Sequence, residues 1–106
     1  MDVDVNWSET PVLVKLTGTL DRVNAKALAA KILCYMRQEG AKLRLSLDKL
    51  KAIEDKALRR LLKKISNYRG SVTLVFGEGA KAVRDAIARL PGRFSGFFED
   101  VGPQPA

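Results

Sequence analysis

The chain has 106 residues, of which 46% are hydrophobic and 29% charged, and its net charge is +7. This balance excludes a disordered polar chain, the length suits one domain with a single core, and no apolar run reaches the roughly 18 residues of a membrane-spanning helix. The N-terminus lacks the basic and apolar segments of a secretory signal. A single cysteine excludes an intrachain disulfide, and the absence of histidine removes the commonest general base and metal ligand.

The first residues predict an antiparallel pair of strands. Residues 3–7 alternate apolar and polar side chains, and residues 12–16 are mostly apolar. A turn cluster at 8–11 separates them, and a connection of this length favours a hairpin. We expect the second strand to end at Gly18.

A helix is predicted next. Asp21 and Asn24 are both suitable N-caps because their side-chain oxygens can accept hydrogen bonds from backbone N–H groups, and Gly40 is suited to end the helix. Cys34 flanks the apolar face and is expected to be a small buried side chain. The helical spacing predicts a buried face made of Ala25, Leu28, Ala29, Ile32, Leu33 and Met36.

The middle of the chain predicts a strand and a second helix. Residues 42–48 alternate strictly between leucine and polar side chains, so we expect a strand with one wet or lightly covered face. The helix is expected to start near Asp55, which is a good N-cap, and to end at Gly70. Its predicted apolar positions are Leu58, Leu61, Leu62, Ile65 and either Tyr68 or the stem of Arg69.

The last third of the chain predicts two strands with a helix between them. Residues 71–76 are expected to form the fourth strand and residues 93–99 a short final one. The turn at 77–79 opens a third helix, which Pro91 closes. Its predicted inward residues are Ala80, Val83, Ile87 and Leu90.

The element order ββαβαβαβ indicates an α/β fold. Strands that alternate with helices predict a mixed, mostly parallel sheet of about five strands, with the first strand as an antiparallel edge. Right-handed crossovers between neighbouring strands place the helices mainly on one face. We expect one domain at 1–100 and a flexible C-terminal tail at 101–106.

The excess positive charge is concentrated in one segment. Residues 49–69 hold eight basic residues and two acidic ones, so almost all of the net charge lies there. Such a segment attracts acidic partners or is simply a solvated helix face. Its two acids, Glu54 and Asp55, are interpreted either as a catalytic pair or as residues that start a helix, and we favour the second role because acids complement the helix dipole.

A glycine-containing turn is a second candidate site. Gly77 and Gly79 precede Lys81 at the start of a predicted helix, and helix N-termini can hold a phosphate or nucleotide. The sequence matches neither the P-loop nor the dinucleotide-binding motif, so tight turn geometry explains the glycines better. We expect no cofactor and no metal site.

Three segments carry a family resemblance. VLVKLTGTLDRVNAKAL contains a Gly-x-Leu-Asp turn at 18–21, LRLSLDKLKAIEDKALRRLL joins a strand to a helix, and GSVTLVF is the next strand. Over about residues 10–98 the chain resembles a STAS domain, the fold of anti-sigma factor antagonists. In that family, a switch loop with the sequence Asp-Ser-Ser-Gly-Leu typically follows an apolar residue, and Ile53 stands at that apolar position.

The switch loop departs from the family's pattern. Glu54 stands at the aspartate, Asp55 at the first serine, Lys56 at the serine that is phosphorylated in sporulation-type members, and Ala57 at the glycine. Lysine offers no hydroxyl, and its charge is opposite to that of a phosphate. We therefore expect no phosphoswitch at the usual position.

The resemblance, with the missing histidine, implies a non-enzymatic cytoplasmic docking module that uses the loop and basic helix at 53–64. At 100° per residue, the cations form a ridge opposite the apolar face, and its members are Lys56, Arg59, Arg60, Lys63 and Lys64. We expect a protein partner with an acidic surface, either an anti-sigma factor or kinase, or a membrane transporter with this chain as accessory subunit. Binding of nucleic acid or an anionic membrane by the same helix is the alternative.

Overall fold

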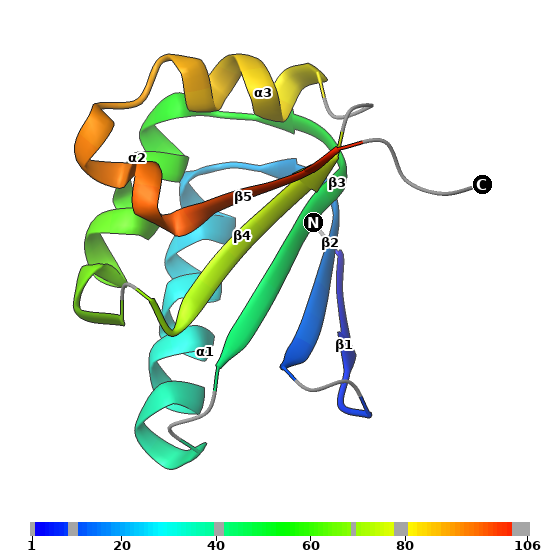
Figure 1. Cartoon of the computed structure of the whole chain (residues 1–106), viewed down its shortest axis with the longest axis vertical. Helices are drawn as coiled ribbons and strands as arrows, with labels where there is room; N and C mark the ends of the chain where they lie inside the picture. The colour runs from blue at the N-terminus through cyan, green and yellow to red at the C-terminus, as the bar shows by residue number, and fades with distance from the viewer. Residues whose placement is uncertain (1, 9–10, 40–41, 69, 78–80, 103–106) are drawn as a thin grey trace.

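The computed structural model describes residues 2–8, 11–39, 42–68, 70–77 and 81–102. Its elements, shown in Figure 1, are β1 (Asp2–Asn6), β2 (Val12–Leu20), α1 (Arg22–Glu39), β3 (Leu43–Ile53), α2 (Asp55–Lys64), η1 (Ser66–Tyr68), β4 (Val72–Gly77), α3 (Lys81–Ala88), η2 (Gly92–Phe97) and β5 (Phe98–Gly102), where η marks a 3₁₀ helix. Within the described ranges, no helix has both the length and the apolar character that a membrane span requires.

The five strands form one sheet in the order β1-β2-β3-β4-β5. β1 is antiparallel to β2, and the other three neighbouring pairs are parallel. Figure 1 shows the long helix α1 behind the sheet, on the same side as α2. The predicted fold class is therefore confirmed: a mixed, mostly parallel sheet with an antiparallel edge strand and helices mainly on one face.

The core lies between the sheet and the helices. Along β3, Leu43, Leu45 and Leu47 are buried in the core, whereas Arg44 and Ser46 are half-buried on the opposite face. This is the alternation that the sequence predicts. The largest fully buried side chains are Phe97, Leu16, Leu20, Leu45, Leu47, Leu58, Leu61, Leu62, Ile65, Leu74, Val72 and Val83.

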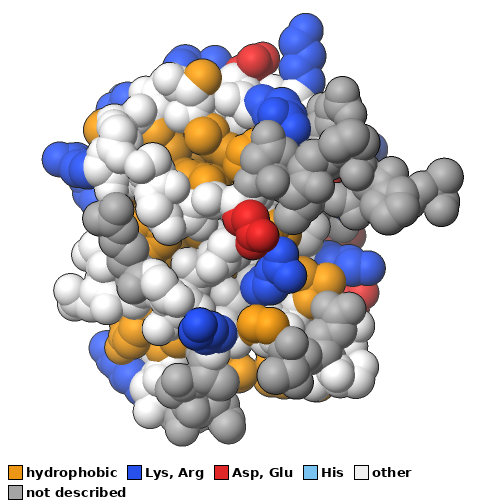
Figure 2. Space-filling view, in the orientation of Figure 1, with side chains coloured by type: hydrophobic (Ala, Val, Ile, Leu, Met, Phe, Trp, Pro, Cys, Tyr) orange, Lys and Arg blue, Asp and Glu red, His pale blue; other side chains and the backbone are white. Residues whose placement is uncertain are grey.

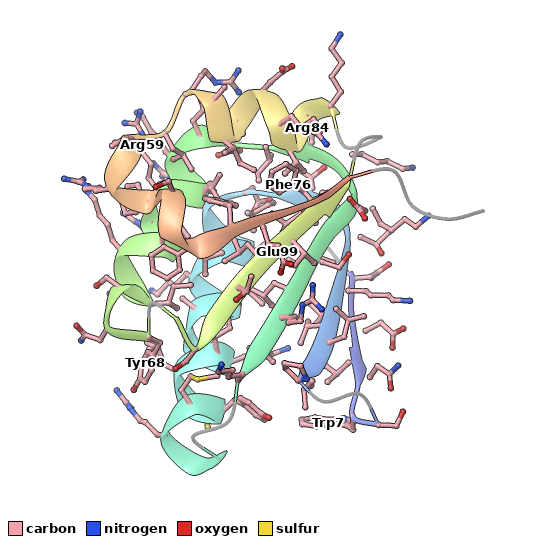
Figure 3. The ribbon with its side chains drawn as sticks, viewed as in Figure 1. Trp7, Arg59, Tyr68, Phe76, Arg84 and Glu99 are labelled. Carbon is pink, nitrogen blue, oxygen red and sulfur yellow. The ribbon has the colours of Figure 1, made fainter. Side chains whose placement is uncertain are left out.

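The opposite face of the sheet carries both polar and apolar side chains. Nη2 of Arg44 in β3 lies 3.2 Å from Oε2 of Glu99 in β5, which makes an exposed ion pair across the intervening strand. Figure 2 views this face and shows an acidic and a basic side chain side by side near its centre, where Figure 3 labels Glu99. Figure 2 also shows hydrophobic side chains around this pair, and Val75, which pairs with Ser46, is buried on the same face, so this face is mixed.

The start of α1 is capped by one of the two predicted residues. The backbone N–H of Asn24 donates to Oδ1 of Asp21 at 2.8 Å, so Asp21 is the N-cap. Asn24 is not a cap but a helical residue, and its Nδ2 donates to the carbonyl oxygen of Thr19 at 3.0 Å. The predicted helix end at Gly40 lies outside the described residues.

The buried face of α1 agrees with the helical spacing, apart from its flank. Five of its six predicted residues are buried and Leu33 is half-buried. The expectation for Cys34 is wrong, because this side chain is exposed. Cys34 comes two residues after the buried Ile32, a rotation of about 200° that turns it toward solvent.

Two strands are longer than predicted. β2 continues through Gly18, which has a φ of 103°, and ends at Leu20. β3 continues past residue 48, because residues 49–53 pair in parallel with the extension of β2. The backbone N–H of Glu54 then donates to the carbonyl oxygen of Leu20 at 3.0 Å, so the pairing reaches the start of α2.

The second helix ends earlier than predicted. α2 stops at Lys64 and is followed by the 3₁₀ turn η1, so Gly70 does not end the helix. Gly70 has a φ of 94°, which allows the chain to turn from η1 toward β4. The four leucine and isoleucine positions predicted for the buried face are fully buried, and Tyr68 is half-buried.

The third helix keeps its predicted side toward the core. In α3 Val83 is buried and Ile87 is half-buried, and Leu90, two residues after the helix ends, is also half-buried. The predicted inward residue Ala80 lies outside the described residues.

The predicted final strand at 93–99 is wrong over most of its length. Residues 92–97 form η2, in which Phe94 and Phe97 are both buried in the core. A spacing of three residues matches one turn of a 3₁₀ helix, so both rings point the same way. The strand β5 begins at Phe98 and runs to Gly102, two residues past the predicted end of the domain.

Candidate docking surface

The helix α2 has an apolar face and a cationic face. Ala57, Leu58, Leu61 and Leu62 are fully buried. The predicted ridge residues Lys56, Arg59, Arg60, Lys63 and Lys64 are all exposed on the other side. Figure 3 shows Arg59 on the outer side of the helix, away from the sheet.

The ridge residues line a groove together with one residue from another helix. The groove has a volume of about 630 Å³, and none of its described lining residues is acidic. We call it the cationic groove; its lining residues are Arg22, Lys56, Arg59, Arg60, Lys63 and Lys64. Six positive side chains around one concavity make an attractive site for anionic groups.

The parallel sheet explains why Arg22 joins the ridge. α1 begins after the carboxyl end of β2, and α2 begins after the carboxyl end of β3, which is its parallel neighbour. The two helix N-termini therefore lie at the same edge of the sheet, and their partial positive charges add to that of the side chains. Sequence periodicity within α2 could not reveal Arg22, but the predicted parallel order of the two strands could have.

The four switch-loop equivalents differ in accessibility. Glu54 has extended backbone angles and precedes α2, but its side chain makes no capping hydrogen bond. Lys56 is exposed and belongs to the cationic groove, whereas Ala57 is fully buried. A partner that meets this loop can therefore reach Glu54, Asp55 and Lys56, but not the side chain of Ala57.

The prediction that Asp55 caps α2 is wrong. Asp55 is the first helical residue, and it forms an ion pair. Its Oδ2 accepts from Nε of Arg89 at 2.7 Å, and its Oδ1 accepts from Nη2 of the same guanidinium at 2.9 Å. These hydrogen bonds with Arg89 lower the pKa of Asp55 and raise that of Arg89. The pair ties the start of α2 to the end of α3, which indicates a structural role rather than a catalytic one.

The glycine turn after β4 is held by protein side chains. The backbone N–H of Gly77 donates to Oδ1 of Asp48, and its carbonyl oxygen accepts from Nε of Arg84 at 3.1 Å. The guanidinium of Arg84 also lies 5.2 Å from the ring centre of Phe76. Figure 3 labels both residues. The amide of Gly77 is therefore already bonded; Lys81 is exposed, and Gly79 lies outside the described residues.

Comparison with known proteins identifies the fold through structure, not through sequence. No family model and no curated protein sequence matches the chain significantly. Among the solved structures that match is the anti-sigma factor antagonist SpoIIAA in its unphosphorylated form, with a TM-score of 0.62 and 14% sequence identity over 94% of this chain and 89% of that one. The fold is that of a STAS domain.

The STAS-like fold confirms the resemblance on which the sequence interpretation depends. The match covers 94% of this chain. At 14% identity it establishes the fold alone, so the role of the groove depends on its own residues.

Proposed function

We propose that this STAS-like domain is a non-enzymatic regulatory module in the cytoplasm. It docks onto an acidic surface of a protein partner through the loop and helix at 53–64, without a serine phosphoswitch. The observation that carries the proposal is the cationic groove, in which six basic side chains meet and no described lining residue is acidic. If these cations formed only a solvated face of α2, there would be no reason for Arg22 of α1 to line the same groove.

The charges act mainly on the rate of association. Basic side chains at the rim of an interface raise the encounter rate with an acidic surface, and this effect falls as salt screens the field. The buried leucines of α2 hold the helix on the core, so the cationic face is presented as a fixed surface. The proposed partner is an anti-sigma factor or kinase-like protein, or a transporter subunit that offers a complementary cluster of carboxylates.

The partner is tested by capture with wild-type protein and with the charge-reversed variant R59E/R60E/K63E/K64E. A partner with an acidic docking surface is retained by the wild type and lost by the variant. The matched control K26E/R37E/K42E/K81E reverses four exposed cations outside the groove and should retain the partner. If both variants lose it equally, the net charge matters and the groove does not.

The alternative class of ligand is separated by a salt titration against DNA, RNA and vesicles of anionic lipid. Nonspecific electrostatic binding to these polyanions disappears by about 0.2 M salt. Binding of nucleic acid or membrane that survives this salt and requires the groove would replace the protein-partner proposal.

The missing phosphoswitch has its own test. Lys56 stands at the phosphorylated position of the family's loop, and the nearest serines outside the loop are half-buried Ser46 in β3 and exposed Ser66 in η1. Incubation of the folded protein with its partner kinase and ATP should leave both serines unmodified. A phosphate on either serine, detected by mass spectrometry, would show that the switch has moved rather than disappeared.

A further inference from the structure

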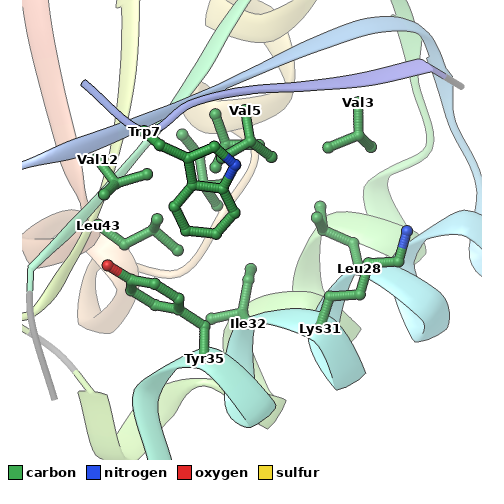
Figure 4. Close-up of a pocket in the computed structure, with 11 residues that line it drawn as sticks. Val3, Val5, Trp7, Val12, Leu28, Lys31, Ile32, Tyr35 and Leu43 are labelled. Carbon is green, nitrogen blue, oxygen red and sulfur yellow. The ribbon is translucent and has the colours of Figure 1, made fainter. Parts of the chain in front are cut away.

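A second concavity lies between the edge strand β1 and the helix α1. It has a volume of about 180 Å³, and its floor consists of the buried core residues Val14, Leu28, Ile32, Leu43 and Leu45. We call it the apolar groove. Figure 4 shows β1 above it and α1 below, with Trp7 and Tyr35 at one side and Val3 and Lys31 at the other.

The rim of the apolar groove exposes large apolar side chains to water. Trp7 is 68% exposed and Val3 is 37% exposed, and these are two of the three large hydrophobic residues that the described part of the chain exposes. The Trp7 ring lies 6.0 Å from the ring of Tyr35 across the mouth. A gathering of exposed apolar side chains over a concave apolar floor is typical of a ligand site rather than of an ordinary surface.

One cation at the rim selects the charge of a ligand. The lining is almost wholly apolar, and Lys31 is the one charged residue among its described members. In Figure 4 the rings of Trp7 and Tyr35 lie at the side opposite Lys31, so they border the apolar part of a ligand. None of the described lining residues is acidic. This set suits an apolar ligand with an anionic, hydrogen-bond-accepting end.

The acids of β1 do not oppose such a ligand. Val3 and Val5 pair with Leu16 and Val14 of the core face, so Asp2 and Asp4 point to the opposite face of the sheet. The same acids make a second copy of the chain a poor occupant, because pairing two β1 edges would bring carboxylates of both copies onto one face.

We propose that the apolar groove binds a medium-chain aliphatic carboxylate, with its chain over the apolar floor and its carboxylate at Lys31. A cavity of about 150 Å³ is enough to hold a benzene molecule, so the groove takes about six carbons and the remaining chain lies along Trp7, at the side away from Lys31. This site is separate from the cationic groove, which is lined by other residues of α1 and α2. The domain thus carries a ligand site in addition to its proposed docking surface.

The ligand site is tested by the fluorescence of Trp7, the only tryptophan in the chain. Titration with decanoate should change its emission saturably and with an affinity at least about tenfold higher than that for decanol or decylamine, which have the same chain but no carboxylate. If decanoate has no saturable effect, or if the three amphiphiles bind equally, the proposal is wrong.

Two variants locate the carboxylate. Lys31→Met keeps the apolar stem of the side chain but removes the ammonium, so it should weaken decanoate about tenfold and leave decanol unchanged. Lys26→Met removes an exposed cation of the same helix outside the groove and should change neither affinity. Unchanged decanoate affinity in Lys31→Met would overturn the proposal. So would Trp7-dependent dimers in sedimentation experiments without ligand, since a second copy would then fill the groove.

Discussion

The cationic groove and the apolar groove both use side chains of α1, but their chemistry is opposite. All described lining residues of the cationic groove are basic, whereas those of the apolar groove include one cation among aliphatic and aromatic side chains. The first should respond to salt and the second to the length of an apolar chain. One helix can therefore serve two surfaces, because its first turn and its middle meet different neighbours.

The largest expected effect on stability distinguishes the buried face of α2, which supports the cationic groove, from the exposed residues that line the groove. Leu61→Ala should lower the free energy of unfolding by about 2–5 kcal/mol, because this fully buried side chain leaves a cavity under α2. Arg60→Ala, on the exposed side of the same helix, should change it by less than about 0.5 kcal/mol. Urea denaturation measures both. A large cost for Arg60→Ala would mean that the cationic face stabilises the fold rather than awaiting a partner.

The rim of the apolar groove should also be dispensable for folding. Trp7→Ala should lower the free energy of unfolding by no more than about 1 kcal/mol, because the loss is mainly the contact with the Tyr35 ring. Phe97→Ala, which removes a buried ring, should cost about 3–5 kcal/mol. The two values come from thermal or urea denaturation. Comparable losses would make Trp7 a structural residue.

Salt gives the most direct contrast between the two grooves. Raising the salt concentration from about 0.05 to about 0.5 M should weaken binding of poly-glutamate, used as a model acidic partner, by about tenfold or more. Binding of decanoate should weaken less, because burial of its chain does not depend on screening. Isothermal titration at several salt concentrations measures both. Equal salt dependence of the two affinities would contradict the assignment of an acidic partner to one groove and an apolar ligand to the other.

The smallest effect concerns the ion pair beside the cationic groove. Asp55 has its pKa lowered below the ordinary value of 3.8, so its stabilising contribution is present at neutral pH and is lost as the pH falls through the lowered pKa. Asp55→Asn should therefore be less stable than the wild type at neutral pH, and the difference should vanish in strong acid. Denaturation midpoints across this pH range test it. Glu54→Gln is the control, because the side chain of Glu54 makes no capping hydrogen bond. This variant should not show the same pH-dependent loss of stability.

The sheet and the basic ridge follow from local sequence patterns. Strict alternation at 42–48 placed the leucines of β3 in the core, and the 3.6-residue period of α2 separated leucines from cations. Both patterns report which side of one element is apolar, so a single sequence reveals them. The extension of β3 to Ile53 does not follow from the pattern at 42–48, because the buried positions shift from odd to even residues between Leu47 and Leu50, where the pairing with β2 is irregular.

The contacts that shape the two grooves join residues far apart in the chain. Arg89 pairs with Asp55 across 34 positions, and Tyr35 faces Trp7 across the gap between α1 and β1. No periodicity within one element reports such pairs. The predictions for Cys34 and for a strand at 93–99 are wrong for a different reason. They depend on the type of each side chain, whereas its direction decides whether it is buried.

The hydrogen bond from Glu54 to Leu20 has a consequence for the entropy of binding. Arg22 and Lys56 each lie two residues beyond this bond, at the starts of α1 and α2. The sheet backbone therefore preorganises the spacing between the two cations before any partner arrives. Association then has to order their side chains but not the loop that carries them, so less of the interaction free energy is spent on immobilising the chain.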